Sequence, residues 1–389
     1  AALRADDRYV VQGLAQDRED VARARGHIQS RGEYGPVSVR CWGGERLPYA
    51  DNTVRLLVSQ QPLTLPESEI MRALQPRGVV CVKQDGQWTT RTKSWPSDID
   101  EWTHSWHAAD SNPVADDTEV GPPRHIQWVG KPRWQRHHDT VPSTTTMVSS
   151  AGRLFYIADV APPSLAGEDV DSWFLIARDA FSGTILWKQP MQEWGAKGWS
   201  KTWLGRGNQP YEISKRLVAV GDMVYVTLGF DEPVTALDAA SGEELMTYPG
   251  TEGASEILYS DGCLIVAVKN RPGKPGRNND PVRESVCAVD ADSGEKLWKS
   301  RNYVGLHANA GSGDGIKCLR PFGRLELTAA DGKVFLANQE AVTCLDMDSG
   351  EKVWEKPRPE VPRKWVMHWS TRSKDTGRLV YADETLLLA

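Results

Sequence analysis

The chain has 389 residues, too long for one ordinary domain, and this length predicts two or three domains. A net charge of -6 argues against a nucleic-acid-binding protein, because such binding needs a concentrated basic face. No apolar run is long enough for a membrane-spanning helix, so we expect no transmembrane segment. The chain starts at Ala1 and ends in a strand-like run, and we expect it to be a segment of a longer protein.

Residues 1–90 alternate between strand-like and helix-like patterns, which predicts a parallel α/β sheet. Asp17 lies where a helix N-cap belongs, and Thr64 with Glu67 resembles a capping box for a second helix that Pro76 stops. Strands are expected at 9–11, 37–41, 54–58 and 79–82, the last of which closes the unit.

Two stretches in this region resemble segments of class I S-adenosylmethionine-dependent methyltransferases. They are Gly43–Asn52, which reads GGERLPYADN, and Ile70–Gly78, which reads IMRALQPRG, and they occur in the family's order. The resemblance covers roughly a quarter of the chain and implies a Rossmann-like domain of which only part is present.

The resemblance also locates the cofactor pocket. Ala15 and Gly43 occupy the places where the family has the acids that contact ribose and adenine, while Asp17, Gly44 and Glu45 lie at residual pocket positions. Asp17 either replaces the ribose acid or only caps its helix. We therefore expect a degenerate, catalytically inactive methyltransferase-like module, with a working S-adenosylmethionine-dependent methyltransferase as an alternative.

Residues 91–150 form a Trp- and His-rich connecting strap without clear periodicity. His104, His107 and His138 are candidate metal ligands, because imidazole together with nearby carboxylates suits several divalent ions. His104 and His107 share a face only if this piece is helical. In the alternative interpretation, the strap packs on the neighbouring domain through its Trp rings and each His bonds to backbone.

A four-fold repeat is the strongest pattern in the chain. Each copy has an alternating strand, an Asp, a Ser-Gly pair and a second strand that carries Trp four residues after the Gly. The Asp side chain can accept amide hydrogen bonds inside a turn, and the Gly supplies a left-handed residue. Such small sheets cannot bury both faces alone, so radial stacking and a β-propeller are predicted. The aspartates are Asp179, Asp238, Asp290 and Asp346.

This motif is similar to the repeat of pyrroloquinoline-quinone (PQQ) dehydrogenases and of their non-enzymatic propeller relatives, which include outer-membrane assembly factors. The resemblance covers residues 151–389 and implies an all-β propeller that is incomplete, with about four blades. It implies that Trp187, Trp298 and Trp354 pack between blades, while Met246 replaces Trp in one copy. The three parts together resemble exported proteins of planctomycete-type bacteria, through Ile99–His104 and Gly121–His125.

Three functions remain open from the sequence. The favoured one is a non-catalytic binding or scaffold propeller fused to the degenerate module, located in the periplasm or at the cell surface. The alternatives are a PQQ-dependent dehydrogenase with calcium and the methyltransferase. A protein or small-molecule ligand is expected at the propeller mouth, where insertions carry Trp194, Trp199, Trp203, Asn208, Gln209, His307, Asn309, Trp365, His368 and Trp369.

Overall fold

The computed structural model describes residues 2–118, 121, 126–130, 143–161, 171–194, 211–270, 283–304, 306–307, 323–338, 340–358 and 378–388. The chain forms two compact units, and each is described by itself. The first comprises Ala1–Ile99, Asp116–Lys131 and Arg178–Trp187; the second comprises Asp100–Ala115, Pro132–Ala177 and Lys188–Ala389. Among the described residues, no helix has the length and apolar character needed to cross a membrane.

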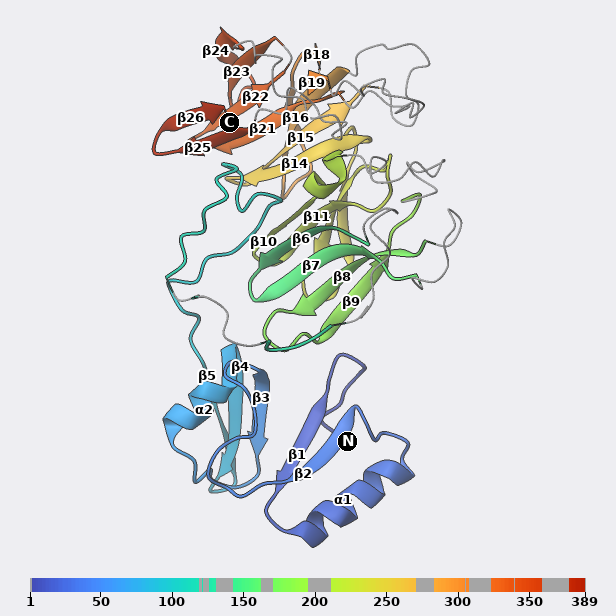
Figure 1. The fold of residues 1–389 in the computed structure, drawn as a ribbon, viewed down its shortest axis with the longest axis vertical. Helices are drawn as coiled ribbons and strands as arrows, with labels where there is room; N and C mark the ends of the chain where they lie inside the picture. Colours follow the sequence, from blue (N-terminus) through green and yellow to red (C-terminus); the bar gives the residue numbers. More distant parts are fainter. Residues whose placement is uncertain are drawn as a thin grey trace, which may run out of the picture. The chain divides into compact units, whose positions relative to one another are not determined.

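Strands and helices alternate at the start of the first unit (Figure 1). The strands β1 (Val11–Ala15) and β2 (Val37–Cys41) pair in parallel, and α1 (Arg18–Ser30) connects them. A second sheet contains β3 (Val54–Ser59), β4 (Leu74–Gln84) and β5 (Gln87–Thr92), with α2 (Glu67–Ala73) before β4.

The helix α1 forms as its sequence predicts. The Asp17 side chain accepts hydrogen bonds from the backbone amides of Glu19 and Asp20, which satisfies two of the free amides at the helix start. On the face that packs inward, Val21 and Ile28 are buried. The predicted N-cap at Asp17 is therefore confirmed.

The sheet of this unit differs from the prediction of one parallel sheet. The described strands form two separate sheets, and β5 runs antiparallel to β4. The hairpin between them turns at Asp85 and Gly86, both with positive φ (50° and 81°), as an Asp-Gly turn allows. This Asp-Gly pair was a sequence signal that the prediction did not use.

The second helix also differs in detail. Pro66 is the N-cap of α2 and makes no side-chain cap bond, so the expected box of Thr64 and Glu67 does not form. Pro76 lies inside β4, where the register against β3 shifts between Val54 and Leu56. Gly78 is required at this irregularity, because a Cβ there would lie 2.7 Å from the Gln75 carbonyl oxygen.

The remaining described residues consist mainly of four sheets, and the sheets succeed one another along the chain (Figure 1). In each sheet, four strands that are consecutive in the sequence pair side by side. The first sheet starts at β6, one strand before the boundary at residue 151 that the repeats suggested. The sheets contain β6 (Thr144–Ser150), β7 (Arg153–Asp159), β8 (Trp173–Asp179) and β9 (Ile185–Pro190); β10 (Leu217–Val220), β11 (Met223–Thr227), β12 (Val234–Asp238) and β13 (Glu244–Tyr248); β14 (Ala254–Ser260), β15 (Cys263–Lys269), β16 (Arg283–Asp290) and β17 (Lys296–Lys299); and β21 (Glu326–Ala330), β22 (Lys333–Ala337), β23 (Ala341–Asp346) and β24 (Lys352–Pro357).

Shorter elements complete the described part. The strand β18 (Tyr303–Val304) adds to β16, and the 3-10 helix η2 (Tyr211–Lys215) precedes β10. Two-stranded pairs are formed by β19 (Leu306–His307) with β20 (Gly323–Arg324), and by β25 (Leu379–Ala382) with β26 (Thr385–Leu388).

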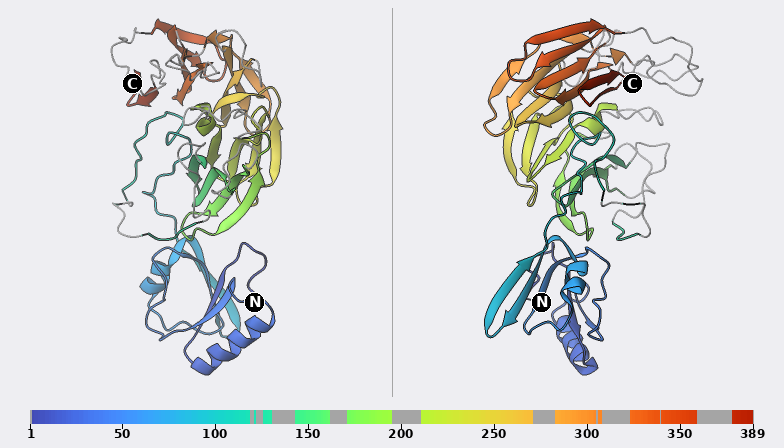
Figure 2. Two further views of the ribbon diagram at one scale, coloured as in Figure 1. Left: turned by 45° about the vertical axis from the view of Figure 1, so that its right-hand side comes forward. Right: turned by 90° about the vertical axis from the view of Figure 1, so that its left-hand side faces the viewer.

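Successive sheets of the second unit pack face to face and bury apolar side chains between them. One apolar cluster joins Ile265 and Ala288 to Leu327 and Leu336, and another joins Val218 and Ala236 to the sheet that contains Ile265. The first strands of successive sheets, named the innermost strands, lie next to one another, β6 beside β10, β10 beside β14 and β14 beside β21, and Figure 2 shows the sheets following one another in an arc. This radial stacking is the arrangement of a β-propeller.

The two ends of these sheets carry different connections. At the end that we name the turn end, tight turns join the first strand of a sheet to its second, and the Asp–Ser–Gly turns join the third to the fourth. At the opposite end, named the loop end, the second strand leads to the third and the fourth leads to the next sheet. The long insertions of the sequence therefore start and finish at the loop end, as expected for a ligand mouth.

Candidate functional site

The repeated Asp residues build the turns that the sequence predicts. Asp290 Oδ1 accepts hydrogen bonds from the Ser293 amide and hydroxyl, both at 2.7 Å, and Gly294 adopts a positive φ of 75°. The Ser293 bonds hold the pKa of Asp290 below its ordinary value. The other three copies make the same Asp-to-Ser contacts. These aspartates therefore stabilise the turns between the third and fourth strands.

The repeat Trp joins one sheet to the next, as the prediction for Trp298 requires. The Trp298 indole donates to the Met347 carbonyl at 2.6 Å, and Met347 follows the Asp of the next copy. The ring packs on Gly350, where a Cβ would lie only 2.5 Å from it. Trp298 is therefore a buried structural residue. Trp354 contacts Phe335 of its own sheet, with ring centroids 6.1 Å apart, and it packs on an apolar cluster that also contains Leu379 of β25.

The copy that lacks Trp has a substitute that sequence reasoning missed. Met246 approaches Gly294, and the Tyr248 hydroxyl donates to the Ala291 carbonyl at 2.6 Å. Ala291 follows its Asp just as Met347 does in the next copy. Tyr248 therefore makes the bond that Trp makes elsewhere, two residues further along the strand.

A segment of the strap, residues 100–111, lies against the innermost strands and is named the axial segment. Its His104 and His107 form an isolated bridge with each other, not a helix. The His104 Nε2 accepts from the Tyr259 amide at 3.0 Å, and its Nδ1 lies 2.7 Å from the Thr103 hydroxyl. Burial lowers the pKa of His104 to about 3, so the ring is neutral.

The second His of this segment is held by acceptors. His107 Nε2 lies 2.7 Å from Asp100 Oδ2, and His107 Nδ1 lies 3.0 Å from the Asn112 carbonyl. The Trp102 ring contacts the His107 ring edge-on at 5.4 Å. The contacts of His104 and His107 therefore agree with the alternative interpretation, in which the strap packs on the propeller and each His bonds to backbone.

A small cavity lies beside the axial segment and is the candidate site of the second unit. It offers about 10 Å³ to the centre of a water molecule, roughly the room for one water. Its lining includes His104, Trp106, Ser111, Lys215 and Glu256.

A buried ion cluster adjoins this cavity. The Lys215 ammonium lies 2.7 Å from both Glu256 Oε1 and Glu326 Oε2, and all three side chains are at most 4% exposed. Glu256 Oε2 also accepts the Leu327 amide at 3.2 Å. Glu256 therefore combines charge pairing with backbone hydrogen bonding, which compensates its removal from water. No pattern in the sequence predicted this cluster.

The metal prediction is only partly covered by the described residues. His138 lies outside them, and so do all the insertion residues named above except Trp194 and the His307 backbone in β19. In the described part of the chain, no three His, Cys, Asp or Glu side chains gather to hold a metal ion. Trp194 is buried and faces Phe230, with ring centroids 6.5 Å apart. The metal site at His104, His107 and His138 stays a prediction.

The residual pocket positions of the first unit lie at the surface or in a turn. Asp17 and Glu45 are exposed, and Asp17 caps α1. Gly44 has a positive φ of 89°, which favours glycine, and the side-chain amide of Gln16 lies where a Cβ would be. Gly44 is thus needed for the turn itself.

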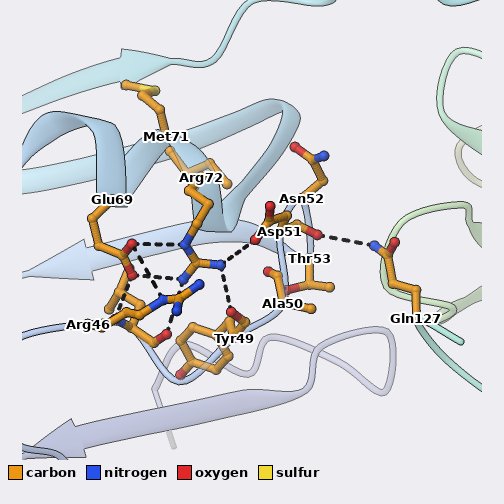
Figure 3. Close-up of polar contacts among 12 residues, drawn as sticks. Arg46, Tyr49, Ala50, Asp51, Asn52, Thr53, Glu69, Met71, Arg72 and Gln127 are labelled. Atoms are coloured by element: carbon orange, nitrogen blue, oxygen red, sulfur yellow. Dashed lines mark hydrogen bonds and ion pairs between the residues drawn. The ribbon is translucent and has the colours of Figure 1, made fainter. Parts of the chain in front are cut away.

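An arginine holds the loop of residues 47–51. Arg72 donates to the Tyr49 carbonyl at 2.8 Å and to Asp51 at 2.6 Å, and it pairs with Glu69 at 2.7 Å (Figure 3). These Arg72 bonds lower the pKa of Glu69 to about 2. The two stretches that carry the resemblance are therefore clamped to each other by Arg72.

Comparisons with known proteins support the propeller. Residues 175–364 match the family model of the outer membrane protein assembly factor BamB, a PQQ-like repeat family. Together with the stacked sheets, this match supports a PQQ-like β-propeller for these repeats. No curated protein has a matching sequence.

Solved structures resemble the chain only loosely. Quinohemoprotein alcohol dehydrogenase from Comamonas testosteroni is 14% identical over 73% of this chain and 43% of its own, with a TM-score of 0.39. The [4+2]-cyclase SpnF is 30% identical over 21% of this chain and 33% of its own, with a TM-score of 0.19. The chain spans less than half of either structure, and neither likeness bears on function.

Proposed function

We propose that this chain is a non-catalytic binding or scaffold propeller fused to a degenerate methyltransferase-like module. The observation that carries this proposal is the use of the buried charges. Lys215 pairs with both Glu256 and Glu326, and Glu256 also accepts a hydrogen bond from a backbone amide of β21. Groups engaged in this way hold strands together and are poorly placed to transfer protons or electrons.

The ligand of such a propeller, a protein or a small molecule, binds at the loop end, where the long connections between strands start and finish. The matching family model is that of an outer-membrane assembly factor, which supports a location in the periplasm or at the cell surface.

The first test addresses the alternative of a PQQ-dependent dehydrogenase. The cavity beside Lys215 has room for about one water molecule, so the described residues do not fit a tricyclic quinone with calcium there. We expect no absorbance change and no dye reduction when the protein is mixed with the quinone and calcium. Quinone-dependent reduction of a dye by an alcohol would contradict the proposal.

The second test addresses the methyltransferase alternative. Two carboxylate contacts to the cofactor are missing at Ala15 and Gly43, and each is worth roughly 1.5 to 3 kcal/mol. Calorimetric titration with S-adenosylmethionine should therefore give no heat of binding. The variant Ala15→Asp with Gly43→Asp is the matched control, because regained binding would show that the rest of the pocket persists. Heat with the unaltered protein would overturn the assignment of a degenerate module.

A further inference from the structure

The axial segment contacts five sheets at one equivalent position. In each innermost strand, the last residue but one donates its backbone amide to the axial segment. The five donors are Ser149, Ala219, Tyr259, Ala329 and Tyr381, and their acceptors are the carbonyls of Trp102 and Thr103, the ring of His104, and the carbonyls of Ala109 and Asp110, at 2.7 to 3.0 Å.

The donors lie on strand edges that have no neighbouring strand in the sheet. An innermost strand pairs with its sheet on one side only, so every second amide points away from the sheet, toward the other innermost strands. Such an amide in a buried place needs an acceptor, because leaving it unpaired costs about 1 to 3 kcal/mol. On β21, the same edge continues through Leu327 and Leu325, whose amides donate to Glu256 and Glu284.

The order of the acceptors follows the order of the sheets. Trp102, Thr103 and His104 serve the first three sheets, and Ala109 and Asp110 serve the last two. The residues between them form the turn that the His107 and Asp100 pair closes.

From this register we propose that the innermost strands form a binding site for an extended chain segment at the turn end of the propeller, and that residues 100–111 of this chain occupy it. The axial segment then orders the sheets about their axis and closes the turn end, which leaves the loop end as the entrance for other ligands. The inference does not depend on the proposed function.

The occupant belongs to this chain because the same segment is tied to the first sheet by a second set of contacts. Glu101 accepts the Ser150 hydroxyl at 3.2 Å and the Ala151 amide at 2.5 Å, and the Trp102 amide donates to the Ser149 hydroxyl. A covalently tethered segment also has a high effective concentration at its own site.

Hydrogen exchange of the intact chain, resolved to single amides, tests the proposal. The five donor amides should exchange at least 100-fold more slowly than unstructured amides, although none of them donates to a neighbouring strand of its own sheet. Val148 and Leu258 are internal controls, since they face the next strand and are protected under any arrangement. Rapid exchange at the five donors, with the controls still protected, would refute the proposal.

A matched pair of variants tests the side-chain acceptor. His104→Gln keeps an acceptor near Nε2, whereas His104→Leu removes it. We expect exchange of the Tyr259 amide to accelerate at least tenfold in the Leu variant relative to the Gln variant, with Ser149 and Ala219 changing less. Equal exchange of Tyr259 in both variants would overturn the role of His104, and protection that appears only in a dimer would assign the segment to a second copy. If the Leu variant fails to fold, the unaltered chain still decides the question through its five donors.

Discussion

The buried charged side chains of the cluster around Lys215 are stabilised by the amides and opposite charges that they contact. Lys215 satisfies two carboxylates, and one of these, on Glu256, in turn satisfies an edge amide of β21. Removing one member of such a cluster leaves buried charge without its partner, which is far more damaging than replacing the whole cluster by apolar groups.

The variant Lys215→Met should therefore destabilise the propeller by about 3 to 5 kcal/mol. The cause is that Glu256 and Glu326 stay buried without their cation. Chemical denaturation followed by Trp fluorescence measures the loss. Lys188→Met, at an exposed position, is the control and should change stability little. A loss below about 1 kcal/mol for Lys215→Met would mean that water reaches the cluster.

His104 predicts a pH dependence of stability. Its pKa is lowered to about 3 in the folded chain, against about 6.5 for an ordinary His. Between these two pH values the unfolded chain binds a proton that the folded chain does not, so stability falls as the pH falls from 6.5 to about 3. Lys215 and Glu256 line the same cavity, and His107 is near. Because these groups can also change stability with pH, the effect of His104 is the difference in stability between the unaltered protein and His104→Gln.

That difference is the quantity to measure, by thermal unfolding at a series of pH values. His104→Gln should lose less stability on acidification than the unaltered protein, because Gln takes up no proton. Parallel pH profiles for the two proteins would show that His104 is accessible to water when folded.

At the scale of the element, the Asp–Ser–Gly turn and the apolar or aromatic residue of the preceding sheet act as one joint. The Gly serves two needs there, a left-handed backbone and a flat surface for the ring. Gly350 has a φ of 68° and contacts Trp298, whereas Gly332 has a φ of 65° and no atom within 4 Å of where its Cβ would lie.

These two glycines separate strain from packing. Gly332→Ala should cost only the strain of a left-handed Ala, about 1 to 2 kcal/mol. Gly350→Ala adds a collision with the Trp298 ring and should cost about 1 to 3 kcal/mol more. Equal losses of the propeller's unfolding free energy in the two variants would mean that the ring moves aside freely.

For the whole molecule, the division into two compact units predicts two unfolding transitions in calorimetry. Arg72→Met breaks the clamp on residues 47–51 and should lower the transition of the first unit by several degrees. Gly350→Ala should lower only the other transition. A single transition that both variants shift equally would show that the units unfold together.

The repeats could be predicted from sequence because their signals are local and recur. Asp, Ser and Gly at fixed spacing fold one turn by themselves, and apolar alternation around them indicates strands that must stack. The same local logic identified the Asp17 cap. It placed the end of the second helix before Pro76, where α2 does end, but it did not predict that β4 starts at Leu74 and contains Pro76 at an irregularity of its pairing with β3.

The amino-acid sequence alone determined the propeller repeats and their turns, since each depends on residues a few positions apart, and the family resemblance indicated the joint at Trp298. Only the tertiary structure decided the path of the axial segment, the cluster of Lys215 with its two glutamates, and the replacement of Trp by Tyr248. These contacts join residues 40 to more than 200 positions apart. Buried polar atoms pair with whichever partners the stacking of the sheets brings close to them. Such pairs do not recur at a fixed spacing in the sequence, so no sequence pattern indicates them.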